Sequence, residues 1–300
     1  VVYLYHNNNK YMKVNLERIF AFDIETAPYQ DFSEESPLWD TWRHRWRKEN
    51  LTDEELLEKY HKEAGLYAEY SQIVCISAGF LHNGTFRLTS YTGDEETLIS
   101  DFLESVTSFI ALRGGAQFLG HNVSNFDACY LRKRYSKFFP MSTYPEFITD
   151  LGLKPWTAGD RFLDTLQLWK GMNFMFSSMA EVAIHLGLPS PKSDTDGSMV
   201  AQLFKDGEVD RIAKYCEGDV YTSFNILCKW LGEPIVDMVV STRSLDKPTI
   251  LKKAIAESAI SDKDMDKLNK VIAELPDNEK EMAEKIITAV TTKTKLQKKR

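Results

Sequence analysis

Four carboxylates occur in three short motifs of this chain, and their types and order could hold two divalent cations. Asp23 and Glu25 belong to the first motif, Asp127 ends the second, and Asp219 ends the third. Two cations about 3.5–4 Å apart can stabilise both the attacking and the leaving oxygen in phosphodiester hydrolysis. Hard cations such as Mg²⁺ and Mn²⁺ prefer oxygen ligands, which carboxylates supply. The set therefore indicates a metal-dependent nuclease.

The apolar patterns around these motifs predict which elements position them. Residues 19–24 form an apolar run typical of a buried strand, and an Asp-x-Glu pair on a strand points both carboxylates to one face. A short strand over 116–119 leads into the second motif. A helix over 208–231 carries the third motif, with Tyr215 one turn before Asp219 on the same face.

The rest of the pattern predicts an alternation of strands and helices, which is typical of an α/β fold. Asn83-Gly84 is a hairpin turn signal between two expected strands. Asp164 stands at a strand end, where an N-cap is favoured over a metal ligand. The other expected elements are strands over 72–81, 84–91 and 161–163, helices over 94–112, 126–135, 177–187 and 197–205, and a loop over 136–160.

Taken together, the three motifs resemble those of the DEDD 3′–5′ exonucleases, in the branch whose third motif reads Tyr-x-x-x-Asp. The residues that carry the resemblance are Phe20-Ala21-Phe22-Asp23-Ile24-Glu25-Thr26, Gly120-His121-Asn122-Val123-Ser124-Asn125-Phe126-Asp127 and Tyr215-Cys216-Glu217-Gly218-Asp219. The similarity is to the proofreading domain of family B DNA polymerases and its stand-alone relatives. It implies a ribonuclease H-like fold, a mixed five-stranded sheet flanked by helices.

The resemblance also implies a role for each motif residue. Asp23 is expected to bridge two cations, Mg²⁺ or Mn²⁺, while Glu25 and Asp219 complete the site that activates the attacking water. Asp127 is expected to support the second ion on the leaving-group side. Tyr215 is expected to orient the water, because a phenol with a pKa near ~10 is a poor free base at neutral pH.

Four further residues are candidate contacts to the 3′ end of the substrate. The resemblance assigns Asn122 to the strand end, Phe126 to a wedge beside the terminal base and the Thr26 backbone to the terminal nucleotide. It makes Lys192 a candidate phosphate contact. The residues alone leave alternatives open: Phe126 could pack in the core, Thr26 could end a strand, and Lys192 could lie in a solvated turn.

Two groups outside the motifs have both a structural and a functional interpretation. Three tryptophans spaced i, i+3 and i+7 share one helical face, and core packing is favoured over a stacking platform for them. They are Trp39, Trp42 and Trp46. A basic run follows the second motif and could guide phosphates or simply face solvent. It consists of Arg132, Lys133 and Arg134.

Bulk composition limits the class of protein. The 43% hydrophobic content supports a large buried core, and the net charge of −7 neither indicates nor excludes nucleic-acid binding. No apolar run approaches the ~20 residues that a membrane helix needs. The cysteines lack zinc-site spacing, so we expect reduced thiols in a cytoplasmic protein. They are Cys75, Cys129, Cys216 and Cys228. Met12 could be the true start.

The sequence predicts two parts, divided after Gly232-Glu233-Pro234. Residues 12–232 are expected to form the exonuclease domain, with a charged, aromatic-rich insertion over 27–70. Residues 233–300 are expected to form a helical, Lys-rich appendage with two amphipathic helices around Pro276. The appendage could bind a replication or repair protein.

The combined interpretation is a metal-dependent 3′–5′ exonuclease that removes nucleotides from single-stranded DNA. RNA remains an alternative substrate, because contacts to the 2′-OH cannot be recognised in the sequence. A non-catalytic nucleic-acid-binding or replication-partner module is the alternative from another class. The intact carboxylate set argues against it, because crowded like charges have no use there without a metal.

Overall fold

A computed structural model of the chain describes residues 2–6, 10–143, 161–172, 175–190 and 195–240. The side chains of residues 2–13 and 239–240 are outside this description. Lys192, most of the expected loop over 136–160 and the expected helices of the C-terminal appendage also lie outside the described residues.

A mixed sheet forms the centre of the molecule, with strand order β7-β6-β3-β4-β5-β8. β3, β4 and β5 form an antiparallel meander, and β6 and β7 run parallel to β3 on its other side. The strands are β3 (Ile19–Pro28), β4 (Ser71–His82), β5 (Thr85–Thr92), β6 (Gln117–Gly120), β7 (Phe162–Asp164) and β8 (Met238–Val240). The first five confirm the expected ribonuclease H-like sheet, and β8 adds a short sixth strand parallel to β5.

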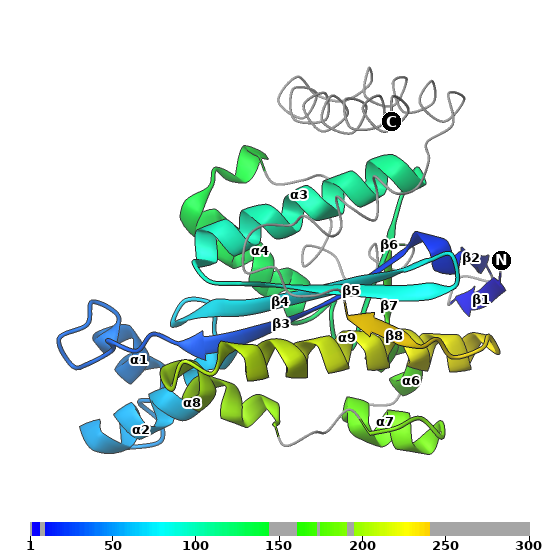
Figure 1. Cartoon of the computed structure of the whole chain (residues 1–300). Helices are drawn as coiled ribbons and strands as arrows, with labels where there is room; N and C mark the ends of the chain where they lie inside the picture. The colour runs from blue at the N-terminus through cyan, green and yellow to red at the C-terminus, as the bar shows by residue number, and fades with distance from the viewer. Residues whose placement is uncertain (1, 7–9, 144–160, 173–174, 191–194, 241–300) are drawn as a thin grey trace, which may run out of the picture.

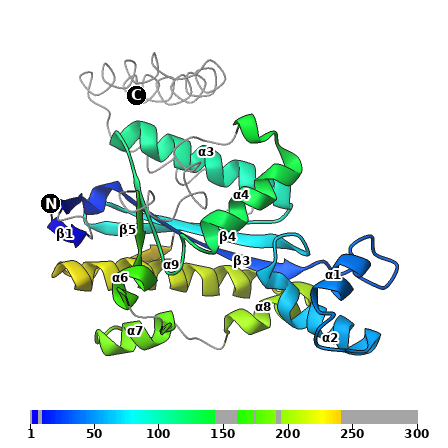
Figure 2. The same cartoon turned by 180° about the vertical axis from the view of Figure 1, so that it is seen from behind.

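Helices cover both faces of this sheet (Figures 1 and 2). One face carries α3 and α4; the other carries α9, with α8 packed beside it on the sheet and with α6 and α7 nearby. Their bounds are α3 (Glu95–Arg113), α4 (Asp127–Phe138), α6 (Thr165–Lys170), α7 (Met179–His185), α8 (Val200–Lys205) and α9 (Val209–Leu231). All but α6 correspond to segments that the sequence predicts as helical, and α9 matches its expected bounds to within one residue.

Alternation along β3 explains the two layers of helices. Phe20, Phe22 and Ile24 pack with α3 and α4, whereas Ile19 and Ala21 pack against α9. Successive side chains of a strand point to opposite faces, so both faces of this central strand are covered. Burying a phenylalanine side chain is worth about 1.5–3 kcal/mol, so each face contributes substantially to the position of β3.

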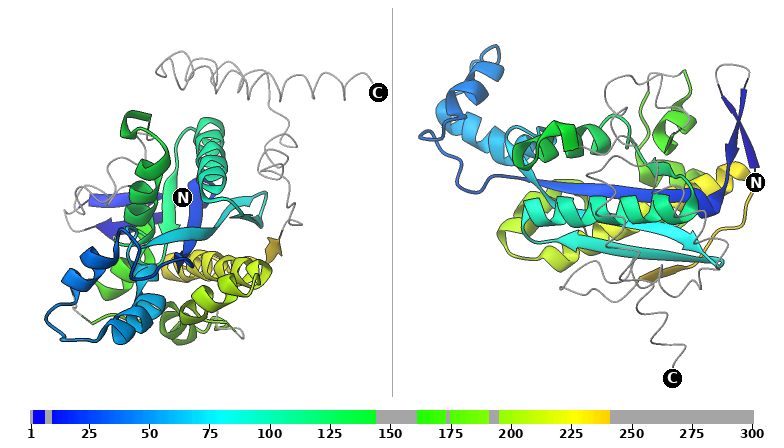
Figure 3. Two further views of the ribbon diagram at one scale, coloured as in Figure 1. Left: turned by 90° about the vertical axis from the view of Figure 1, so that its left-hand side faces the viewer. Right: turned by 90° about the horizontal axis from the view of Figure 1, so that it is seen from above.

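The insertion between β3 and β4 forms a small aromatic cluster of its own. It contains α1 (Trp39–Arg45) and α2 (Asp53–Glu63), at the end of the molecule opposite the N-terminal hairpin (Figure 3). Trp42 is fully buried, and its Nε1 donates to the Leu56 carbonyl at 3.0 Å. Trp39 is also buried, and Trp46 packs against the same cluster. Core packing of the tryptophan stripe is therefore confirmed.

The N-terminal hairpin was not expected from the sequence. β1 (Val2–His6) and β2 (Lys10–Val14) pair with each other in a separate two-stranded sheet. Each strand is only five residues long, and its few β-branched and aromatic residues are a weak local signal for a strand. At the other end, β8 joins the sheet beyond Gly232; the division between domain and appendage stays a prediction. Across the described residues, no helix has the length and hydropathy of a membrane span.

Candidate metal centre

The first motif lies on the α9 side of β3. Asp23 and Glu25 follow Ile19 and Ala21 at two-residue spacing, so all four side chains face the same way. Asp23 is half-buried and Glu25 retains 8% of its exposure. On the side of β3 that faces α9, hydrophobic side chains are thus followed by a pair of carboxylates, near the start of that helix.

The second motif brings Asp127 to the open edge of the same strand. β6 pairs with β3 only from Ile19 to Ala21, which leaves the Ile24 N–H without a strand partner on that side. Asp127 Oδ1 accepts a hydrogen bond from this N–H at 3.0 Å, and the side chain is 3% exposed. The chain turns closely at Gly120, where a Cβ would lie 2.9 Å from the Phe22 carbonyl oxygen. Glycine therefore permits the turn that carries Asp127 to β3.

Asp164 holds the loop of the second motif in place. Its Oδ1 accepts from the Leu166 N–H at 3.0 Å, as expected of the N-cap of α6, and this confirms the N-cap prediction. The same carboxylate also accepts from the Asn122 N–H at 2.9 Å and the Ser124 N–H at 3.1 Å. Asn122 has a φ of 68°, in the left-handed region that asparagine tolerates better than most residues. The cap therefore also fixes a strained turn, a role that the sequence did not reveal.

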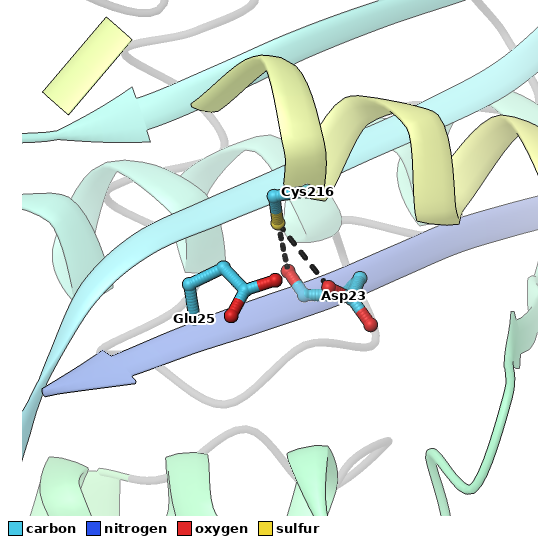
Figure 4. Close-up of side chains that lie close together, drawn as sticks. All are labelled: Asp23, Glu25 and Cys216. Atoms are coloured by element: carbon cyan, nitrogen blue, oxygen red, sulfur yellow. Dashed lines mark hydrogen bonds between the residues drawn. The ribbon is translucent and has the colours of Figure 1, made fainter. Parts of the chain in front are cut away.

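The third motif places a thiol directly over Asp23 (Figure 4). Cys216 Sγ donates to Asp23 Oδ2 at 3.3 Å and is in contact with the Asp23 carbonyl at 3.4 Å. One potential ligand atom from each of Asp23, Glu25 and Cys216 lies within 4.8 Å of the others. Cys216 is buried and unpaired, as the sequence predicts for all four cysteines. Its contact with Asp23 was missed, although its i, i+3 spacing from Asp219 placed it on the same helical face.

Burial raises the pKa values of all four carboxyls, and negative charges nearby add to the effect for Asp23, Glu25 and Asp127. Burial, followed by the charges of Asp127, Glu25 and Asp219, holds the pKa of Asp23 well above its usual value. Burial and the charge of Asp219 do the same for the pKa of Glu25. Burial raises the pKa of Asp127 and that of Asp219 each to about 7. These residues, far apart in sequence, therefore share one electrostatic site that needs protons or cations to balance it.

Tyr215 lies at the same site with its hydroxyl protonated at neutral pH. Burial raises its pKa, and the negative charges of Asp219, Glu25 and Asp23 raise it further. A hydrogen bond between Tyr215 and Asp219 lowers the pKa of the carboxyl. The tyrosine hydroxyl is also 3.8 Å from the place that a Cβ on Gly197 would take. The phenol can therefore donate a hydrogen bond, but it is a poor proton acceptor.

Comparison with protein families identifies the group to which this arrangement belongs. Residues 66–232, more than half of the chain, match a family described as a predicted 3′–5′ exonuclease related to the exonuclease domain of PolB. The chain belongs to this family. The matched segment contains Asp127, Tyr215 and Asp219, whereas Asp23 and Glu25 precede it. No curated protein matches the chain.

Divalent cations fit the donor set of this exonuclease family member. Four carboxyls with raised pKa values lie close enough to influence one another, and such a group gains most from positive charge placed between them. Carboxylate oxygens suit Mg²⁺ and Mn²⁺. The thiol of Cys216 is a softer donor, and its hydrogen bond to Asp23 places it beside the carboxylate oxygens.

The candidate substrate contacts have different surroundings in the structure. Thr26 is half-buried, and its Oγ1 donates to the Gly65 carbonyl at 2.7 Å, so its hydroxyl serves the fold. Phe126 is half-buried beside the core, with its ring 5.3 Å from that of Tyr130. Asn122 Oδ1 accepts from Asn125 Nδ2 at 3.3 Å, within the turn that precedes Asp127. Thr26 follows Glu25 and Phe126 precedes Asp127 in the sequence. The role of Thr26, Asn122 and Phe126 toward substrate stays a prediction.

The basic run on α4 separates into three different environments. Arg134 is buried and makes a bidentate ion pair with Glu95, with Nε at 2.7 Å and Nη2 at 2.5 Å. Lys133 forms an exposed ion pair with Glu69 at 2.9 Å. Arg132 is half-buried, and its Nε has no hydrogen-bond partner among the described residues. Of these three side chains, Lys133 and Arg134 are engaged in ion pairs, and Arg132 makes none within the part of the chain that the structure describes.

Proposed function

We propose that the protein is a 3′–5′ exonuclease that removes nucleotides from single-stranded DNA with the help of two divalent cations, Mg²⁺ or Mn²⁺. The observation that carries this proposal is the convergence of Asp23, Glu25, Asp127 and Asp219 into one buried electrostatic site. The family assignment supports the direction of cleavage, because the family is itself described by 3′–5′ exonuclease activity.

The four carboxylates would hold the cations, with Asp23 between them and Asp127 on the leaving-group side. When bound, such ions stabilise charge on the attacking and leaving oxygens of the phosphodiester. The chain itself supplies the geometry. The Ile24 N–H fixes the rotamer of Asp127, and packing of α9 on the sheet fixes Tyr215 and Asp219 over β3.

Tyr215 is proposed to position the attacking water. Its raised pKa keeps the hydroxyl protonated, so the phenol donates to an oxygen and does not remove a proton. Positioning of this kind lowers the barrier because the reacting oxygen is held in a productive orientation before the reaction.

Contacts to the 3′ end are assigned to Asn122, Phe126, the Thr26 backbone and Lys192. Stacking of an aromatic ring on the terminal base tolerates every base, which suits an exonuclease without sequence preference. We also propose that residues 233–300 form an appendage that binds a replication or repair protein. The four unpaired thiols support a cytoplasmic location.

Two other functions make different demands on the same residues. A non-catalytic binding module would have no use for four clustered carboxyls with raised pKa values, since keeping them ionised at such a site destabilises the fold. An RNA exonuclease would use the same site and differ only in contacts to the 2′-OH. DNA is favoured through the relation of the family to the exonuclease domain of PolB.

The test uses a 5′-labelled single strand, prepared both as DNA and as RNA, with Mg²⁺ or Mn²⁺ and with EDTA as the control. The proposal expects a ladder that shortens from the 3′ end, only with metal and faster on DNA. Faster degradation of RNA would favour the RNA alternative. Internal cuts, or cleavage that persists in EDTA, would contradict the proposed mechanism.

A further inference from the structure

A hydrogen-bond chain, buried at Ser77 and Glu217 and half-buried at Ser90, runs across the sheet beside the candidate metal centre and ends on α9. Asp23 lies opposite Ser77 on β4, and Ser77 lies opposite Ser90 on β5. Residues directly opposite each other in antiparallel strands share a face, so this row faces α9. Ser90 Oγ donates to Glu217 Oε1 at 2.7 Å, and Glu217 is 2% exposed.

The direction of the chain follows from the number of protons that each group carries. A serine hydroxyl has one proton, and Ser90 gives its proton to Glu217. The contact of 2.8 Å between Ser77 Oγ and Ser90 Oγ therefore has Ser77 as donor. By the same reasoning, the thiol of Cys75 donates in its 3.8 Å contact with Ser77. Every bond points toward Glu217, and successive bonds of this kind polarise one another.

Glu217 stands between the residues of α9 that are proposed to face the cations. Cys216, which contacts Asp23, precedes it by one position, and Asp219 follows it by two. Neighbouring residues of an α-helix are about 100° apart around its axis. A bond that fixes Glu217 against β5 therefore fixes the rotation of the helical turn that presents Tyr215, Cys216 and Asp219 to β3.

We propose that Glu217 is a positioning residue of the metal centre, which acts through Ser90 and Ser77 to hold the first half of α9 in register with Asp23 and Glu25. This inference rests on the proposed function, because it takes cation binding to be the reason why α9 must be held in this position. Groups that orient metal ligands from outside the site typically affect metal affinity or activity by about 10–100-fold.

The experiment compares three variants of the full chain: Glu217→Ala, Glu217→Gln and Ser90→Ala. The first deletes the acceptor and the third deletes its donor, so both should weaken Mn²⁺ binding or lower kcat by about 10–100-fold. Glutamine keeps an oxygen that accepts the serine proton, so Glu217→Gln should remain within about threefold of the unchanged protein. Mn²⁺ affinity is measured by calorimetry, kcat and KM on single-stranded DNA, and Tm without metal.

Asn225→Ala is the matched control on the same helix. Asn225 is buried at 3% exposure, and its Oδ1 accepts from the Val236 N–H at 3.0 Å, away from the carboxylates. This variant should lower Tm and leave Mn²⁺ affinity and kcat unchanged. The proposal is overturned if Glu217→Ala behaves like this control, or if Glu217→Gln is as impaired as Glu217→Ala. Absence of DNA cleavage by the unchanged protein would contradict the proposed function alone, since Mn²⁺ affinity still reports on Glu217.

Discussion

Replacing Asp219 by asparagine should stabilise the metal-free protein at pH 8 while it removes a proposed metal ligand. Burial raises the pKa of Asp219 from 3.8 to about 7. A carboxyl with a raised pKa stabilises the folded state fully below its unfolded pKa, and this contribution is lost as pH rises through the folded pKa. At pH 8 the Asp219 carboxyl is therefore ionised in the folded protein, although its buried site favours the neutral acid. This lowers the free energy of unfolding.

The size of the effect follows from the pKa values. At about 1.4 kcal/mol for each pKa unit, the rise corresponds to roughly 4 kcal/mol between pH 4 and pH 8. Asparagine weakens the hydrogen bond that Tyr215 gives to the charged oxygen, which costs about 1–2 kcal/mol. The net gain is then roughly 2–3 kcal/mol, or about 5–10 °C in Tm for a protein of this size.

The assay is thermal unfolding in EDTA at pH 5 and at pH 8. At pH 5 the carboxyl is protonated and resembles asparagine, so the two proteins should differ little. Added Mn²⁺ should stabilise the unchanged protein more than the variant, because a ligand stabilises only the fold that binds it. If Asp219→Asn did not raise Tm at pH 8, or raised it equally at both pH values, the electrostatic reasoning would be refuted.

Asp164→Asn provides the matched control for the same experiment. Asp164 is buried like Asp219, yet its oxygens accept from the N–H groups of Asn122, Ser124 and Leu166. An amide places an NH₂ group where those donors need an oxygen. This variant should therefore have a lower Tm than the unchanged protein at pH 8, opposite in sign to the Asp219 variant.

Three further predictions follow from single residues of the site and of α4. Tyr215→Phe should lower single-turnover cleavage by about ten- to a thousandfold with little change in strand binding, because it deletes only the positioning hydroxyl. Arg132→Ala should weaken binding of single-stranded DNA and reduce its salt slope by about 1, whereas Lys133→Ala, whose ion pair with Glu69 already engages the ammonium, should change both less. Arg134→Ala should lower the free energy of unfolding in urea by roughly 3–5 kcal/mol, because it leaves Glu95 buried without its partner.

Each of these predictions has a result that contradicts it. Unchanged cleavage by Tyr215→Phe would assign the ring to packing alone. Equal effects of Arg132→Ala and Lys133→Ala on the salt slope would show that Arg132 has no particular role in phosphate binding. A small loss of stability in Arg134→Ala, below about 1 kcal/mol, would show that the ion pair contributes no more than an exposed one.

Local patterns account for the parts of the fold that the sequence predicts well. The apolar runs of β4 and β5, joined at Asn83-Gly84, became the antiparallel hairpin, with both turn residues at positive φ. The amphipathic run of α9 became one long helix. Periodicity and turn chemistry act over a few residues, so they are visible before any tertiary contact is known.

Contacts between distant segments account for what the sequence did not show. Ser90 and Glu217 are 127 positions apart, and Asn122 and Asp164 are 42 apart. A serine or a glutamate carries no local signal for such a bond. The pairing of β8 with β5 likewise depends on the return of the chain after α9. For α4, spacing grouped the three basic residues, whereas burial and ion pairing separated them.

The most direct test of the proposed function compares the unchanged protein with Asp23→Asn on a 5′-labelled single-stranded DNA in Mn²⁺. Asp23 contacts the thiol of α9 and shares its charge repulsion with the other three carboxyls. We predict stepwise shortening from the 3′ end by the unchanged protein. The variant, folded and at least as stable without metal, should show no cleavage above background. Cleavage by Asp23→Asn at the unchanged rate would show that the carboxylates on β3 do not carry the reaction.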